Sequence, residues 1–71
     1  MITFKNDRTR PVVELARTAA QAGSYQRAID LLAEADSLEA WAFADAAYES
    51  RTAIAATITK IRRAERQATA R

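Results

Sequence analysis

Apolar side chains recur at helical spacing in three segments of the chain, and one glycine separates the first segment from the second. In the first segment these residues follow an i, i+3, i+4, i+7 pattern, which predicts a helix over residues 10–22. Pro11 suits the first turn of that helix, with Thr9 before it as a candidate N-cap. Gly23 is a typical residue just past a helix end, so it predicts the stop. The apolar positions of this first segment are Val12, Leu15, Ala16, Ala19 and Ala22.

A second helix is predicted over residues 24–35, with Ser24 as its N-cap. It carries one apolar stripe at helical spacing, made of Tyr25, Ala28, Ile29, Leu32 and Ala35. Asp36 and Ser37 then form the next candidate cap, and Glu39 falls in the first turn that would follow, where the helix dipole favours an acid.

From residue 38 to residue 68 no glycine or proline interrupts the chain, and good helix formers dominate. We therefore expect one long third helix over 38–68. At 1.5 Å per residue it would be roughly 45 Å long, whereas a compact chain of this size is only about 30 Å across. Such a helix would extend beyond its own domain.

Two apolar strips are expected on this third helix, centred more than 90° apart. The first strip, which we assign to the core, contains Phe43, Ala47, Ile54, Ile58 and Ile61. The second strip contains Leu38, Trp41, Tyr48 and Ala55. If the first two helices cover one strip, the other has no partner inside the chain, and exposed apolar patches are typical interaction sites. We expect the second strip to be a protein interface, with a two-fold homodimer as the simplest arrangement. The alternative is one wide core face in a monomeric three-helix bundle.

The fold class predicted from these patterns is all-α. A short helical hairpin packs on a long C-terminal helix, preceded by an N-terminal arm over residues 1–9. The length of 71 residues allows a single domain, 1–71. Apolar types make up 49% of the chain, but 18 residues are alanine, which leaves few large side chains for a core. Helix packing or a partner chain must therefore supply the stability.

Composition excludes several kinds of chemistry. With no cysteine and no histidine, the chain lacks disulfides, thiolate nucleophiles, histidine acid–base catalysis and the common zinc sites. Two carboxylate pairs at i, i+4 spacing, Asp30/Glu34 and Asp45/Glu49, are read as a solvated acidic face, because helical di-metal sites combine such acids with histidine. We expect a protein that is not an enzyme and that has no cofactor and no metal.

Charge is distributed unevenly along the chain. The net charge is +2 overall, with −4 over residues 11–59 and +4 over residues 60–71. The basic C-terminal segment suits the negative end of a helix dipole. It also makes nucleic acid a possible partner, through Lys60, Arg62, Arg63 and Arg66.

The segment Ala22-Gly23-Ser24-Tyr25-Gln26-Arg27-Ala28-Ile29-Asp30-Leu31-Leu32-Ala33-Glu34-Ala35 resembles the centre of a tetratricopeptide repeat. In that family Gly23 would permit the tight turn, Tyr25 would fill the wedge between the helices, and Ala28 would allow their close approach. The resemblance covers residues 11–36 as one partial repeat, without the family's tryptophan and Leu-Gly in the first helix. It implies an antiparallel helical hairpin and a protein-binding role.

Together these patterns predict a non-catalytic protein-binding module, acting as a small adaptor, inhibitor or regulator of a larger protein. Small phage or plasmid accessory proteins are similar in size and style. The alternative is a small nucleic-acid-associated regulator that binds through the basic C-terminal helix. The N-terminus has no apolar signal-peptide core, and no apolar run has the length of a membrane span, so we expect a cytoplasmic protein.

Overall fold

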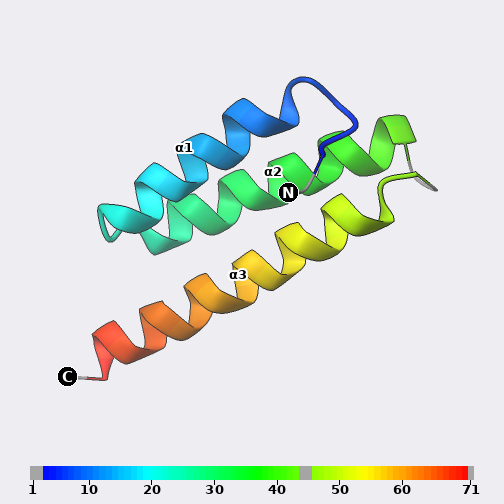
Figure 1. Cartoon of the computed structure of the whole chain (residues 1–71). Coiled ribbons are helices and arrows are strands. Elements are labelled where there is room, and N and C mark those ends of the chain that lie inside the picture. The colour runs from blue at the N-terminus through cyan, green and yellow to red at the C-terminus, as the bar shows by residue number, and fades with distance from the viewer. Residues whose placement is uncertain (1–2, 44–45, 71) are drawn as a thin grey trace.

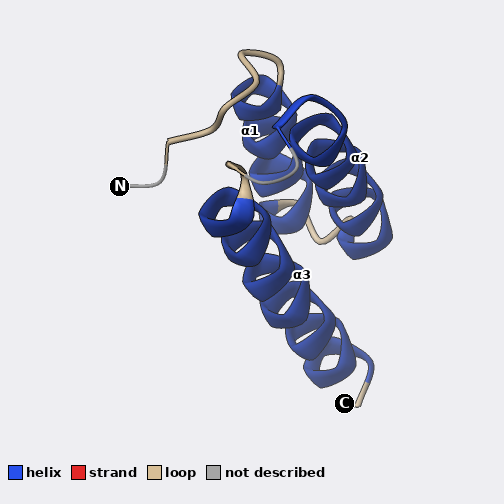
Figure 2. Cartoon of the chain, turned by 90° about the vertical axis from the view of Figure 1, so that its right-hand side faces the viewer, coloured by secondary structure: helices blue, strands red, loops and turns tan. Residues whose placement is uncertain are grey.

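The chain is all-α in the residues that the computed structural model describes, which are 3–43 and 46–70, with the backbone alone at 42 and 43. Its helices are α1 (Thr9–Gln21), α2 (Tyr25–Phe43) and α3 (Tyr48–Thr69). α1 and α2 form an antiparallel hairpin, and α3 returns along another side of α2 (Figure 1). α2 is therefore the central helix, because both others pack against it. Figure 2 shows the three helices from another side, with α1 and α2 next to each other and α3 below them. The predicted all-α, three-helix fold is confirmed.

The turn between α1 and α2 has the geometry expected at Gly23. This glycine has a φ of +83°, in the left-handed region that favours glycine. Its amide donates to the carbonyl of Ala20 at 3.0 Å, and the Ser24 amide donates to the carbonyl of Ala19 at 2.8 Å. These bonds satisfy carbonyls at the end of α1. The carbonyl of Ser24 then accepts the Ala28 amide at 3.0 Å, which begins α2.

The second helix does not end at residue 35, and the predicted continuous helix over 38–68 is wrong. α2 runs through this point to Phe43, and α3 begins only at Tyr48. Asp36 and Ser37 are residue types that can cap the start of a helix, but both can also lie inside a helix without ending it. The hydroxyl of Ser37 donates to the carbonyl of Ala33 at 3.1 Å within the helix. α3 has 22 residues and is about 33 Å long, so it fits within the 41 Å length of the molecule.

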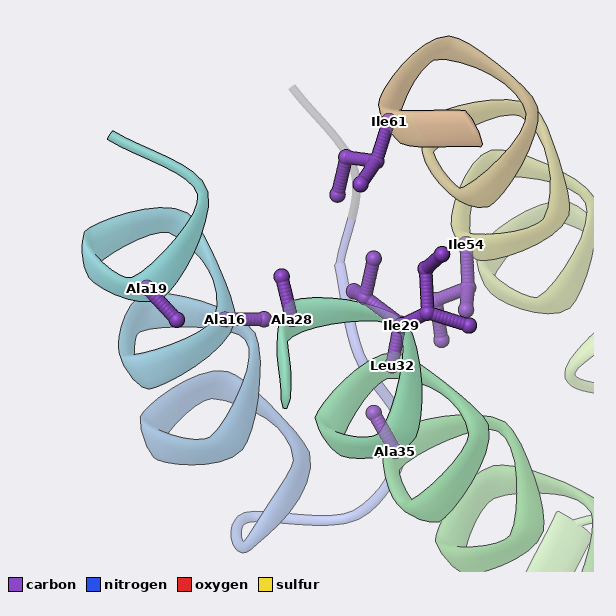
Figure 3. Close-up of a cluster of buried hydrophobic side chains, with 8 residues drawn as sticks. All are labelled: Ala16, Ala19, Ala28, Ile29, Leu32, Ala35, Ile54 and Ile61. Atoms are coloured by element: carbon purple, nitrogen blue, oxygen red, sulfur yellow. The ribbon is translucent and has the colours of Figure 1, made fainter. Parts of the chain in front are cut away.

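The core lies along α2, between the other two helices (Figure 3). Small side chains dominate the α1 side, where Ala16 and Ala19 of α1 belong to the same buried cluster as alanines of α2. Larger aliphatic side chains dominate the α3 side. Alanine therefore permits a close hairpin, and branched side chains fill the wider space toward α3. The buried apolar cluster contains Ala16, Ala19, Ala28, Ile29, Leu32, Ala35, Ile54 and Ile61.

The strip that we assigned to the core is largely buried where the structure describes it. Ala47, Ile54 and Ile61 are buried, and Ile58 is half-buried against the core. The side chain of Phe43 lies outside the described residues. The hairpin positions named in the tetratricopeptide resemblance lie at the α1–α2 end of the molecule: Ala28 is buried and Tyr25 is half-buried.

Candidate interaction surfaces

The carboxylate of Glu39 joins the N-terminal arm and all three helices at one end of the molecule. Its Oε1 accepts the Lys5 amide at 2.8 Å and the Ser50 hydroxyl at 2.6 Å. Its Oε2 accepts the Asn6 amide and the Thr9 hydroxyl, both at 2.8 Å. Glu39 is completely buried, and none of these four donors is charged. Three donors from residues 5–9, which lie 30 to 34 residues from Glu39 in sequence, thus meet Ser50, 11 residues away, on one side chain.

Burial raises the pKa of Glu39, but hydrogen bonds outweigh this effect, and the net pKa lies below its ordinary value of 4.5. The Ser50 hydroxyl, the amides of Lys5 and Asn6 and the Thr9 hydroxyl all favour the ionised form. Thr9 is the first residue of α1 and Ser50 is the third residue of α3. The positive ends of two helix dipoles therefore also face this carboxylate.

Glu39 is a positioning residue rather than a reactive one. With four donors on its two oxygens, the carboxylate has little capacity left to accept a substrate proton. Its effect is to fix the starts of α1 and α3 against the last turns of α2.

Two residues of this cluster differ from their predicted roles. We assigned Glu39 to the first turn of a third helix, whereas it lies within α2. Its position continues the buried stripe of Leu32 and Ala35 at i+7 and i+4, and that register was the signal available for finding it. Thr9, expected as an N-cap, uses its hydroxyl on Glu39. Asn6 instead accepts the Arg8 amide at 2.9 Å before α1 begins.

Two large aromatic side chains are exposed at the same end of the molecule. Trp41, near the end of α2, is 91% exposed, and Tyr48, the first residue of α3, is 76% exposed. Of the other residues predicted for this interface, Ala55 is exposed and Leu38 is half-buried. The four residues do not form one strip on one helix, because Leu38 and Trp41 belong to α2, whereas Tyr48 and Ala55 belong to α3. We call the exposed pair, Trp41 and Tyr48, the aromatic corner.

A shallow groove of about 600 Å³ begins at Tyr48 and follows the junction of α2 and α3. Its apolar lining comes from Tyr48, Ala55 and Ile58 of α3 and from Ala33 of α2, with Ile54 at its base. Asp36 and Arg51 cross the groove as an exposed ion pair, 3.0 Å between Nε and Oδ1. Exposed pairs of this kind contribute little to stability. The groove therefore has an open, mainly apolar surface with one polar crossing.

The basic residues lie at the opposite end of α3. Their side chains are all exposed, whereas Ile61 among them is buried. Beside them, Arg62, Glu65 and Arg66 form a second hollow with Gln26 and Ile29 near the start of α2. The exposed basic residues are Lys60, Arg62, Arg63 and Arg66. They form a cationic surface at the C-terminal end of α3, which we call the basic end.

The predicted carboxylate pairs lie on the surface as far as the structure describes them. Asp30, Glu34 and Glu49 are exposed, and Asp45 lies outside the described residues. Asp30 accepts the side-chain amide of Gln26 at 2.9 Å. Across residues 3–43 and 46–70 no group of three or more acidic side chains could hold a metal ion. None of the helices in these ranges has the length and apolar character to cross a membrane.

Comparison of the chain with family models, curated proteins and solved structures finds no match.

Proposed function

We propose that the chain is a non-catalytic protein-binding module, which acts as an adaptor, inhibitor or regulator of a larger protein. The observation that carries this proposal is the 91% exposure of Trp41, the one tryptophan in the chain. Burying a large apolar side chain stabilises a fold by roughly 1.5–3 kcal/mol. The chain has few large apolar residues, yet its own fold gains no such stabilisation from Trp41, because that side chain is exposed. Tryptophan and tyrosine are the residue types enriched at the energetic centres of protein interfaces.

Two features support a role that involves no chemistry on a substrate. The most buried carboxylate, Glu39, is saturated by neutral donors. The sequence also lacks cysteine and histidine, the most versatile nucleophile and acid–base groups. What the surface offers instead is the aromatic corner, at the end of the molecule where the Glu39 hydrogen bonds join α2 to the starts of α1 and α3.

The test is affinity capture from a lysate of the source organism, followed by titration of the purified partner. We expect Trp41→Ala to weaken binding by about 30-fold, which corresponds to a hot-spot loss of about 2 kcal/mol. Leu15→Ala is the matched control, because Leu15 is 55% exposed on the other side of the hairpin, in α1. A partner that binds the Trp41→Ala variant as tightly as the wild type would contradict the proposal. Unchanged thermal unfolding of both variants excludes loss of fold.

The basic end supports a second candidate function, a nucleic-acid-associated regulator. Its four cations are exposed, and no ion pair involves them among the described residues. If three of them contact phosphates, affinity for a labelled duplex should fall with a log–log salt slope of about −2.7. Arg62→Ala combined with Arg66→Ala should reduce that slope by about 2, while Arg27→Ala, an exposed control on α2, should leave it unchanged. A slope near zero would exclude this function.

A further inference from the structure

The exposed face of α3 has a spacing that suits a second helix. Its residues follow alternating steps of four and three, the spacing of a helix–helix seam. All are exposed, and three of them, Tyr48, Thr52 and Ala55, also line the apolar groove between α2 and α3. The face contains Tyr48, Thr52, Ala55, Thr59, Arg62 and Arg66. We call it the α3 seam.

The two ends of the α3 seam are complementary, because one offers an aromatic ring with an acid next to it and the other offers two cations. One end presents the ring of Tyr48 with the carboxylate of Glu49 beside it, and the other presents the guanidinium groups of Arg62 and Arg66. A cation is attracted to the face of an aromatic ring and to a carboxylate. The helix that fits this surface best therefore runs antiparallel to α3, with cations opposite Tyr48 and an aromatic ring opposite Arg62.

The chain itself carries that helix, because Ala55 lies seven residues after Tyr48 and seven residues before Arg62. We propose that two copies of the chain associate through the α3 seam, with α3 of each copy antiparallel in the α2–α3 groove of the other. A two-fold axis at Ala55 places each Tyr48 opposite Arg62 of the partner subunit. The small side chain of Ala55 permits close approach of the two helices at the axis. A parallel arrangement would bring the basic ends together and is disfavoured by repulsion.

The small size of this surface favours a weak dimer. From Tyr48 to Arg66 the seam is about 27 Å long, and α3 together with the α2 wall of the groove is about 20 Å wide. The footprint of about 540 Å² is below the roughly 800 Å² per partner of a standard interface. We therefore expect a reversible dimer with a Kd in the range of about 1–100 µM. This inference does not rest on the proposed function, which is carried by Trp41 on α2, outside the seam, although Tyr48 belongs to both surfaces.

Sedimentation equilibrium from about 1 to 300 µM tests the proposal. We expect a concentration-dependent monomer–dimer equilibrium for the wild type. Ala55→Glu should weaken it by about tenfold or more, since it places two like charges at the axis. Ala56→Glu is the matched control, because Ala56 is also exposed but lies off the seam, and it should change the Kd less than about threefold. A monomeric wild type at 300 µM, or equal effects of the two variants, would overturn the proposal.

A charge exchange tests the antiparallel register. Tyr48→Lys should weaken the dimer by opposing Arg62 of the partner subunit, and Arg62→Glu should weaken it by removing the cation. The double variant Tyr48→Lys/Arg62→Glu should recover at least about half of the combined loss in binding free energy, because each position then faces an opposite charge. If the dimer Kd of the double variant is no lower than that of the single variant with the higher Kd, the antiparallel pairing is wrong. Circular dichroism of each variant verifies the fold.

Discussion

Replacing Glu39 with glutamine should strongly destabilise the fold without changing the shape of the side chain. In the wild type, each carboxylate oxygen accepts one backbone amide and one hydroxyl. Glutamine replaces one of these oxygens with an NH₂ group, which donates hydrogen bonds and cannot accept them. The hydroxyl of Ser50 or Thr9 can rotate to accept from the new group. A backbone amide, of Lys5 or of Asn6, cannot, so one donor is left facing another donor.

The magnitude follows from the number of bonds that change. An unsatisfied donor costs about 1–3 kcal/mol, and a hydrogen bond to a charged acceptor is worth about 1 kcal/mol more than a neutral one. Removal of the buried charge also relieves a desolvation cost, which offsets part of this loss. The expected net loss from Glu39→Gln is about 2–3 kcal/mol. A domain of this length has a total stability of only about 4–10 kcal/mol, so the loss is a large fraction of it.

Urea and thermal unfolding followed by circular dichroism measure this loss. For a domain of this size, 2–3 kcal/mol corresponds to a fall in Tm of roughly 10–20 °C. Glu34→Gln is the matched control, since Glu34 is exposed on the same helix and its replacement should change stability by less than about 0.5 kcal/mol. If Glu39→Gln unfolds at the wild-type temperature, the inferred role of the Glu39 hydrogen bonds is wrong.

The pH dependence provides an independent check. The pKa of Glu39 is lowered in the folded protein, so the native state binds fewer protons there than the unfolded state does. The resulting stabilisation is fully present above about pH 4.5, the ordinary pKa, and is lost as the pH falls through the lowered pKa. The difference between wild type and Glu39→Gln should therefore shrink in acid. A difference that stays constant from pH 7 to pH 3 would contradict a charged Glu39.

Three further substitutions test other parts of the fold by the same unfolding measurements. Gly23→Ala should cost about 1–2 kcal/mol, because the φ of +83° is unfavourable for alanine even though an added Cβ meets nothing within 4 Å. Leu32→Ala should cost about 2–5 kcal/mol by leaving a cavity at the centre of the core, whereas Leu15→Ala, on the exposed face of α1, should cost much less. Phe4→Ala should cost about 1–2 kcal/mol and make the N-terminal arm more sensitive to proteolysis, because Phe4 packs against the core. If the arm of this variant resists proteolysis as well as the wild type does, the Glu39 hydrogen bonds alone hold the arm in place.

The sequence by itself determined the features that depend on local conformation or on composition. Gly23 marks the hairpin turn because few other residues adopt a positive φ at low cost. The stripes at helical spacing identify the core-facing sides of α1 and of the first part of α2. The exposure of Trp41 and Tyr48 was also expected, but on the ground of one continuous third helix that carries both, whereas Trp41 lies on α2 and Tyr48 begins α3. The basic end follows directly from the residues present.

Only the tertiary structure decided where α2 ends and what Glu39 does. Asp36 and Ser37 are compatible both with a helix start and with a helix interior, because neither residue prevents the backbone from continuing. The longer α2 is favoured because it brings Glu39 to the buried side, where Lys5 and Asn6 of the arm and the first turns of α1 and α3 donate to it. Those donors are 11 to 34 residues away in sequence. A pattern of neighbouring residues in the sequence carries no information about hydrogen-bond partners that only folding brings close together.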